Sequence, residues 1–296
     1  MATEARTSRL ADRAGEGRRD FLRLLAASLL GSTPASAWPG PAPTVITAPN
    51  AGAMPVNQLA ISGNACGPAA LLTAFRCGNV NWQQAARVPG NSDREQLSWV
   101  IRRHALVRSS HLPDRTRWHR TRGINVADLT DIANEMAAPL LLPRVASRLL
   151  FAENREDPAK LLRRVHSHLA TSLRKGLPPV ASLRRYTRRP GSDGNPQWVT
   201  LEGHFVVVTA IPAKLPTDAR TFSFDYIDPW GGKRLTGTCR AALPPAASPV
   251  RKGAAVDSLA APACLEADCP GSLIGLGKVH PGDQTTVAFE AIIGRP

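Results

Sequence analysis

Residues 64–72 read Asn-Ala-Cys-Gly-Pro-Ala-Ala-Leu-Leu, which places a cysteine at the mouth of a short apolar helix. Proline is tolerated in the first turn of a helix, and Gly78 is well placed to end it, so the stretch predicts a helix over roughly 67–77. Because a helix N-terminus stabilises negative charge, Cys66 is placed for nucleophilic chemistry. A lone cysteine in such a context is more often a small buried hydrophobe, so the assignment needs support from elsewhere in the chain.

That support comes from two downstream segments. Gly203-His204 opens the run Phe205-Val206-Val207-Val208, and Tyr226-Ile227 leads into Asp228-Pro229. If both segments are strands joined by a turn near 214–218, the start of the first lies beside the end of the second, and His204 meets Asp228. Asp225 is a competing carboxylate, but strand alternation favours Asp228. A thiol, an imidazole and a carboxylate are the groups that nucleophilic acyl transfer requires.

Hydrophobic periodicity predicts a helical first half and a β-rich second half. Helices are expected over 93–104, from residue 125 or 126 to just before Pro139, and over 157–175. Short segments rich in β-branched or aromatic residues, typical of strands, occupy 179–183, 198–201, 204–211, 221–227 and 285–293. Helices followed by antiparallel strands indicate the α+β class, with N-terminal helices packed on a C-terminal antiparallel sheet.

The N-terminal 37 residues have the features of an export signal. Arg18-Arg19 precede a weakly hydrophobic run over 24–31, and Ala35-Ser36-Ala37 supplies a small-residue cleavage site. This pattern resembles a twin-arginine signal peptide, and its apolar run is far shorter than the ~20 residues that span a bilayer. We therefore expect twin-arginine export machinery as a partner, no membrane span in the mature chain, and a periplasmic or extracellular location.

The rest of the chain divides into a leader and one large domain. Residues 38–55 are rich in Pro and Ala and predict an extended leader, and residues 56–296 are long enough for a single catalytic domain. Within that domain, residues 241–263 are dominated by Ala and Pro and predict a long loop insertion.

The formal net charge of +14 is carried mainly by arginine. A strongly basic chain can attract nucleic acid or other anionic polymers. The chain has only two tyrosines and seven phenylalanines to stack on bases, and no aromatic-interleaved basic module is recognisable. A solvated basic surface explains the charge, and no nucleic-acid partner is expected.

Five cysteines suggest pairs plus one remaining thiol in an oxidising compartment. Cys77 lies eleven residues along the same predicted helix, roughly 16 Å from Cys66, so the two cannot bridge. Cys66 is the natural free thiol, and three pairings of the other four remain open, of which the short spacing favours Cys264 with Cys269. A zinc site is disfavoured by that spacing and by the lack of an adjacent histidine pair, and no phosphate loop or dinucleotide fingerprint appears. No metal or cofactor is implied.

These motifs, in this order, resemble the papain-like cysteine peptidases, and most closely their bacteriocin-processing, double-glycine leader peptidase-like branch. The resemblance spans about 57–232. It implies a papain-like two-part fold, Cys66 as nucleophile, His204 as general base and then acid, and Asp228 as the group that orients the imidazole. It also implies that Gln58 is the counterpart of the family's oxyanion-hole glutamine.

The expected function is that of an exported thiol hydrolase that cleaves a peptide or amide bond of a peptide or protein substrate through a Cys66 acyl-enzyme. The Cys66 backbone N–H and an amide side chain, Gln58 or Asn64, would donate hydrogen bonds that stabilise the negative charge developing on the carbonyl oxygen. Two alternatives remain open. The same triad would serve acyl transfer to an amine or cleavage of cell-wall peptide amides, and a degenerate domain would bind without catalysis.

Overall fold

The computed structural model describes residues 44–61, 64–153, 156–190, 196–241 and 264–296. Every described element belongs to one compact unit, Pro43–Pro296. The expected signal peptide, residues 1–37, therefore lies outside the described residues. So do residues 38–43 of the expected leader and 242–263 of the expected insertion.

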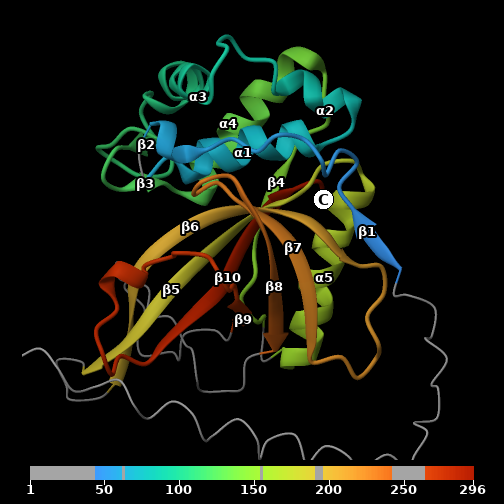
Figure 1. Ribbon diagram of the computed structural model, residues 1–296, viewed down its shortest axis with the longest axis vertical. Coiled ribbons are helices and arrows are strands. Elements are labelled where there is room, and N and C mark those ends of the chain that lie inside the picture. The colour runs from blue at the N-terminus through green and yellow to red at the C-terminus, as the bar shows by residue number, and fades with distance from the viewer. Residues whose placement is uncertain (1–43, 62–63, 154–155, 191–195, 242–263) are drawn as a thin grey trace, which may run out of the picture. The chain divides into compact units, whose positions relative to one another are not determined.

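Six antiparallel strands form a closed barrel (Figure 1). Neighbours pair in the order β6, β5, β10, β9, β8, β7, and β7 pairs back with β6. In chain order the six are β5 (Val180–Pro190), β6 (Pro196–Pro212), β7 (Thr221–Asp228), β8 (Lys233–Ala241), β9 (Leu265–Asp268) and β10 (Thr285–Gly294). Two short strands extend the sheet, β1 (Val45–Thr47) beside β6 and β4 (Ala146–Leu149) beside β10.

Four helices gather beyond one end of the barrel, and a fifth lies along its side (Figure 1). The first four are α1 (Cys66–Cys77), α2 (Val80–Ala85), α3 (Asp93–Val100) and α4 (Val126–Ala137), and the fifth is α5 (Pro158–Arg174). Short helical turns are η1 (Gln58–Ala60), η2 (Ile101–Ala105), η3 (Ala138–Leu140) and η4 (Leu276–Lys278). A separate hairpin joins β2 (Trp118–His119) to β3 (Gly123–Ile124).

Side-chain caps explain where most of these helices begin. The residues before α2, α3, α4 and α5 are Asn79, Ser92, Asn125 and Asp157, and each accepts a hydrogen bond from a backbone N–H of the first turn. Such a cap stabilises a helix by about 1 kcal/mol. The predicted helices over 67–77, from 125 or 126 to before Pro139, and over 157–175 are confirmed within a residue or two, and the one over 93–104 continues from α3 into η2.

Aromatic side chains from several strands pack together in the hydrophobic core. Along β7, Phe222, Phe224 and Tyr226 alternate with exposed residues and are buried. Phe224 meets Phe289 of β10 edge to face at 5.7 Å, although β7 and β10 are not neighbours in the sheet. Contacts of this kind add about 1 kcal/mol to the free energy gained from burial, so the interior is a packed core that holds the strands at fixed positions.

The predicted fold class, a papain-like α+β arrangement with N-terminal helices on a C-terminal sheet, is wrong. The described chain is mostly β, and its main sheet closes on itself. Two strands of the ring, β8 and β9, were not predicted, because the mixed polar sequence of residues 233–241 and the four-residue length of β9 give little periodic signal. Closure depends on pairings between distant segments, such as Val180 with Ile293, which local patterns do not reveal.

Part of the predicted leader belongs to the barrel unit. Val45–Thr47 pair with β6, and the Asn50 N–H donates to the Cys77 carbonyl at 2.9 Å. Residues 44–55 are therefore held by the domain that follows them.

The expected disulfide between Cys264 and Cys269 is not formed. All five cysteines lie among the described residues, and no two of them are joined in a disulfide. The two residues flank β9, and an extended strand rises about 3.3 Å per residue, so their Cα atoms lie roughly 16 Å apart. A disulfide requires Cα atoms closer than about 7 Å.

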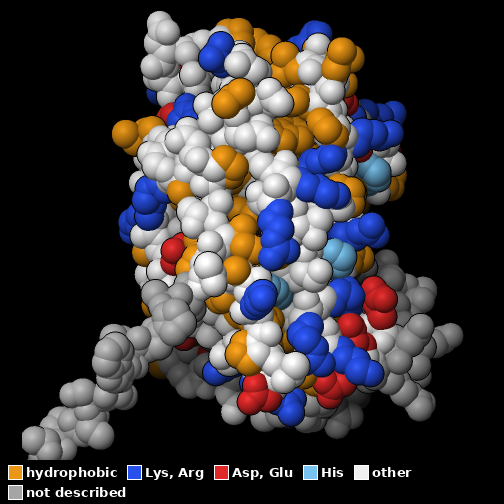
Figure 2. Space-filling model, turned by 90° about the vertical axis from the view of Figure 1, so that its right-hand side faces the viewer, with side chains coloured by type: hydrophobic (Ala, Val, Ile, Leu, Met, Phe, Trp, Pro, Cys, Tyr) orange, Lys and Arg blue, Asp and Glu red, His pale blue; other side chains and the backbone are white. Residues whose placement is uncertain are grey.

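Basic side chains are spread over the surface. On the face drawn in Figure 2, Lys and Arg lie among apolar and neutral polar residues and are not gathered in one patch. Among the helices of the described residues, none combines the length and the apolar character needed to cross a bilayer.

Candidate active site

The three predicted catalytic residues come from three elements that meet where the helices cover the barrel. Cys66 begins α1, His204 lies in β6 and Asp228 ends β7. The antiparallel register pairs Val207 with Ile227, and continuing it puts His204 and Asp228 on one face as diagonal neighbours. The predicted juxtaposition of the two strands is therefore present.

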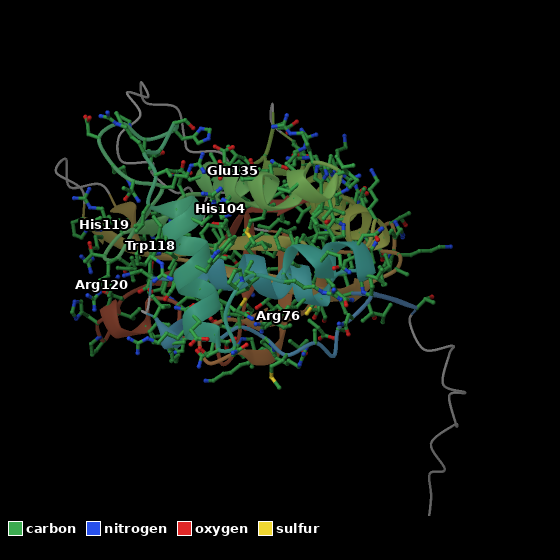
Figure 3. The ribbon with its side chains drawn as sticks, turned by 90° about the horizontal axis from the view of Figure 1, so that it is seen from above. Arg76, His104, Trp118, His119, Arg120 and Glu135 are labelled. Carbon is green, nitrogen blue, oxygen red and sulfur yellow. The ribbon has the colours of Figure 1, made fainter. Side chains whose placement is uncertain are left out.

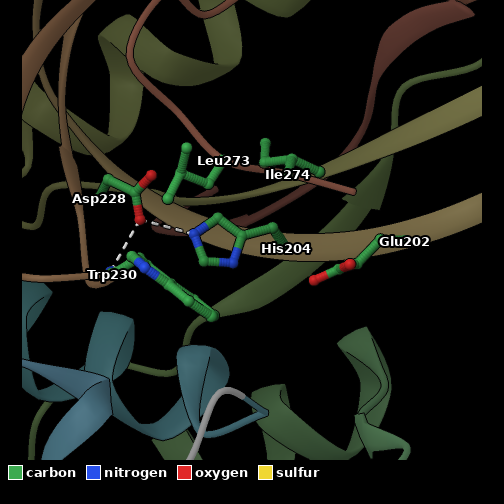
Figure 4. A pocket seen from close by; sticks show the side chains of 6 residues that line it. All are labelled: Glu202, His204, Asp228, Trp230, Leu273 and Ile274. Carbon is green, nitrogen blue, oxygen red and sulfur yellow. Dashed lines mark hydrogen bonds and ion pairs between the residues drawn. The ribbon is translucent and has the colours of Figure 1, made fainter. Parts of the chain in front are cut away.

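His204 and Asp228 form a buried hydrogen-bonded pair. The His204 Nε2–H donates to Asp228 Oδ1 at 2.7 Å, and the two residues are 5% and 2% exposed (Figure 4). Burial alone raises the pKa of Asp228, but hydrogen bonds from His204, the Trp230 backbone N–H and the Ser272 hydroxyl outweigh it and hold that pKa below its ordinary value. Asp228 is therefore a carboxylate at neutral pH.

Cys66 lies within hydrogen-bonding reach of the same imidazole. Because Nε2 is occupied by Asp228, the nitrogen left for the thiol is Nδ1. Burial alone lowers the pKa of His204, but the hydrogen bonds to Asp228 and Cys66 and the charges of both groups raise it to about 10. The imidazole is thus held protonated at neutral pH beside the Asp228 carboxylate.

The start of α1 suits a reactive sulfur. Cys66 is 7% exposed, and Ala65 caps the helix with no side-chain hydrogen bond. The first N–H groups of a helix have no intrahelical partners, so they can stabilise negative charge at this end. Gly67 fits closely here, because a Cβ at this position would collide with the Ile124 side chain.

The four other cysteines are poor nucleophiles. Burial raises the pKa of Cys77 to about 11 and the pKa of Cys264 and Cys269 to about 12, and the buried Cys239 is shifted in the same direction. These four remain thiols at neutral pH, so a thiol reagent can report on Cys66 selectively.

The two expected oxyanion amides have different surroundings. Gln58 is fully buried in η1, which packs against α1, and its backbone N–H donates to the carbonyl of Pro229, the residue after Asp228, at 3.0 Å. The Asn64 side-chain amide donates to the Arg120 carbonyl at 2.8 Å. The assignment of Asn64 to the oxyanion hole is therefore not supported, and Gln58 remains the candidate.

Asn64 instead ties the β2–β3 hairpin to the segment before Cys66. The Trp118 indole N–H donates to the Asn64 carbonyl at 2.9 Å, and the Asn64 amide returns a bond to Arg120. Figure 3 shows Trp118, His119 and Arg120 grouped on this hairpin. The hairpin thus holds the loop that leads into Cys66.

A small pocket opens beside the catalytic pair. Its walls are His204, Asp228, Glu202, Trp230, Leu273 and Ile274. In Figure 4 the imidazole lies between the Trp230 side chain on one side and Leu273 and Ile274 on the other. The Glu202 carboxylate pairs with Lys278 Nζ at 3.2 Å. The pocket therefore has a polar part, formed by Glu202, His204 and Asp228, and an apolar part, formed by Trp230, Leu273 and Ile274.

Sequence reasoning missed four of these residues and Ser272. Trp230 follows Asp228-Pro229 directly, so an aromatic residue next to the expected carboxylate was an available signal. Ser272, Leu273 and Ile274 come from a turn after β9, and Glu202 from the middle of β6. Nothing in their local sequence points to the site.

The remaining candidates have structural roles. Asp225, the competitor of Asp228, is exposed and accepts a hydrogen bond from Thr236 at 2.8 Å. The ligand-type atoms of His111, Asp128 and Asp131 lie within 4.8 Å of one another. In that group His111 bonds Asp131 at 2.8 Å, and Asp128 accepts from Ser109, so the cluster is held together by its own hydrogen bonds.

Comparison with protein-family models, with curated proteins and with solved structures found no match to this chain. Support for a function lies in Cys66, His204, Asp228 and the residues that surround them.

Proposed function

We propose that this chain is an exported thiol hydrolase that cleaves a peptide or amide bond through an acyl-enzyme on Cys66. The supporting observation is the buried His204–Asp228 hydrogen bond of 2.7 Å, with Cys66 within hydrogen-bonding reach of the same imidazole. The order and roles of these residues resemble those of the papain-like cysteine peptidases and of their bacteriocin-processing branch.

In the first half-reaction the Cys66 thiolate attacks the substrate carbonyl carbon. Negative charge builds on the carbonyl oxygen, where the Cys66 backbone N–H and the Gln58 amide act as donors. The C–N bond then breaks, and the His204 imidazolium gives its proton to the departing amine. The products of this step are a thioester on Cys66, a free amine and a neutral imidazole.

In the second half-reaction His204 takes a proton from water, and the hydroxide attacks the thioester carbonyl. The C–S bond breaks, the carboxylic acid leaves, and the thiolate and imidazolium are restored. Asp228 keeps Nε2 protonated throughout, so that Nδ1 is the nitrogen that exchanges protons with the reacting groups.

Alkylation by iodoacetamide separates an active site from a degenerate binding domain. A free thiol is almost entirely protonated at pH 6, whereas a thiolate paired with an imidazolium reacts at least ~10-fold faster. We expect fast labelling of Cys66 in the wild type and slow labelling in His204→Ala, measured by intact mass with Cys66→Ser as the control. A wild-type rate equal to that of a free thiol would favour the binding domain.

Intact mass of the protein after mixing with peptide amides or esters distinguishes hydrolysis from transfer. We expect an acyl adduct on Cys66 that decays in water. If an added amine captures the acyl group and water does not, the chain is an acyltransferase, and if only cell-wall peptide amides form the adduct, it is a cell-wall amidase.

We propose further that residues 1–37 direct twin-arginine export and are removed after Ala37, which leads to a periplasmic or extracellular protein. The pair Arg18-Arg19 and the Ala-Ser-Ala site support this proposal. The double substitution Arg18→Lys and Arg19→Lys keeps the charge, and we expect it to leave the uncleaved protein inside the cell. Export of the double variant at the wild-type rate would contradict the proposal.

A further inference from the structure

Asp228 receives a separate hydrogen bond on each carboxylate oxygen. Oδ1 accepts from His204 Nε2 at 2.7 Å and from the Trp230 backbone N–H at 2.8 Å. Oδ2 accepts from the Ser272 hydroxyl at 2.9 Å, and Ser272 is 5% exposed. Because the Ser272 bond is on the oxygen that does not face the imidazole, it fixes the rotation of the carboxylate.

Ser272 is held in place by a tightly anchored segment. This segment, Cys269–Gly275, follows β9, and within it the Ser272 N–H donates to the Cys269 carbonyl at 3.1 Å. Arg185 of β5 donates to the Ile274 carbonyl, and the Ser272 hydroxyl itself bonds Asp228 at the end of β7. The segment is therefore attached to two barrel strands, and its hydroxyl has a defined position.

We propose that Ser272 is a positioning residue of the active site, which holds the Asp228 carboxylate charged and turned toward His204. Its importance for catalysis rests on the proposed hydrolase function. Its effect on the Asp228–His204 pair is independent of any substrate. The alternative is that the hydroxyl only satisfies a buried acceptor and contributes to folding alone.

The titratable groups around Asp228 make a pH test interpretable. They are His204 of β6, Tyr226 of β7, Cys269 beside Ser272, and Glu202 across the pocket. Burial raises the pKa of Tyr226 above its ordinary value and that of Cys269 to about 12, so both remain neutral in acid. Loss of Cys66 reactivity in acid therefore reports on the thiolate, His204, Asp228 and Glu202, and of these only Asp228 loses a hydrogen bond in the Ser272 variants.

The first readout is the rate of Cys66 alkylation by iodoacetamide as the pH is lowered. Without the Ser272 hydroxyl, Asp228 takes up a proton at higher pH. In Ser272→Ala the alkylation rate should therefore fall at a pH about half to one unit higher than in the wild type, which shifts the acid limb of the rate–pH profile. Ser272→Thr keeps the hydroxyl and should restore the wild-type limb. Ser109→Ala is the matched control, because Ser109 donates to the buried Asp128 in the same way but away from this pair, and its limb should not move.

The second readout is the proton NMR signal of His204 Nε2–H, identified by its absence in His204→Ala. In Ser272→Ala this low-field signal should weaken and disappear at a higher pH than in the wild type. If Ser272→Ala does not fold, Ser272→Gly, which leaves room for water, is the second variant. It should shift the acid limb and the loss of the ring-proton signal to higher pH in the same way. A folded variant without the hydroxyl that keeps both the wild-type limb and the wild-type signal would overturn the positioning role.

The two proposals fail in different ways. If wild-type Cys66 reacts as slowly as a free thiol, the hydrolase proposal is contradicted, whereas the ring-proton signal still tests Ser272. If wild-type Cys66 reacts fast and the Ser272 variants behave as wild type, only the positioning role is wrong.

Discussion

The charge of Asp228 is stabilised by three donors, from His204, Trp230 and Ser272. A buried carboxylate without such partners would take up a proton, because burial disfavours charge. The three bonds therefore explain how an anion persists at 2% exposure and how it keeps the neighbouring imidazole protonated.

Asp228→Asn removes the negative charge but keeps a side chain of nearly the same shape, so it should abolish the stabilisation of the protonated imidazole. Without the negative charge the pKa of His204 falls from about 10, and we expect hydrolysis to drop by about 10²–10⁴-fold, with slow alkylation of Cys66 at pH 6. Asp225→Asn, on the exposed side of the same strand, is the control and should keep wild-type rates. Equal losses in the two variants would argue against a specific role for Asp228.

Gln58→Ala separates charge stabilisation from thiolate formation. An oxyanion donor acts only when a carbonyl is attacked, so we expect turnover to fall by about 10²–10³-fold while alkylation by iodoacetamide stays near the wild-type rate. Thermal unfolding should be recorded in parallel, because Gln58 is fully buried. Unchanged turnover in a folded variant would exclude Gln58 as a donor.

Single residues were predictable where their local context carries chemistry. Cys66 before an apolar helix, His204 at the start of a valine-rich strand and Asp228 at a strand end were each identified from neighbouring residues. The hydrogen bond from Asn64 to Arg120 was not predictable, because it depends on a hairpin that begins more than fifty positions away. Ser272 was missed for the same reason, since its partner Asp228 lies 44 positions earlier.

Among the elements, α1 is positioned by close packing at its first turn. The β2–β3 hairpin packs Ile124 against Gly67, and Leu129 of α4 lies near the same point. Because Gly67 follows Cys66 directly, the fit of this turn sets where the sulfur lies.

Gly67→Ala should therefore destabilise the protein by about 1–3 kcal/mol, because the new methyl group overlaps Ile124 in a packed region. Chemical denaturation measures the change, and the alkylation rate of Cys66 should fall with it. Gly52→Ala is the control, since a Cβ at Gly52 meets nothing within 4 Å, and it should leave stability nearly unchanged. A Gly67→Ala protein as stable as the control would contradict the packing argument.

Helices were predicted better than strands because their signals are local. A cap residue and a repeat of three or four residues lie within one segment, as in α4 and α5. Strands β5, β6, β7 and β10 carry long β-branched or aromatic runs and were detected, although β6 was divided in two at Glu202-Gly203. The short strands β1, β4 and β9 are defined by their partners on distant strands.

At the scale of the whole molecule, ring closure fixes β6 on both sides. Pairing with β5 and with β7 limits the movement of His204 relative to Asp228, and the helices bring Cys66 to the same place. The sequence predicted that these three residues meet but not that a barrel holds them. The meeting of His204 and Asp228 depends on one strand pair, β6 with β7, whereas closure of the barrel depends on six strand pairs.

The unit Pro43–Pro296 contains every described element, so the preceding residues should not be needed for its stability. We expect a protein that lacks residues 1–37 to unfold at the same temperature as the full-length chain and to label at Cys66 at the same rate. A lower unfolding temperature would mean that the segment contributes to the folded domain.

The protonation state of His204 at neutral pH is the most direct test of the account. Nitrogen NMR of the ring should show an imidazolium at pH 7 that loses its proton near pH 10, and Cys66→Ala should lose it at lower pH because one of the two stabilising partners is gone. A neutral His204 ring at pH 7 in the wild-type protein would contradict the thiolate–imidazolium pair on which the proposed chemistry depends.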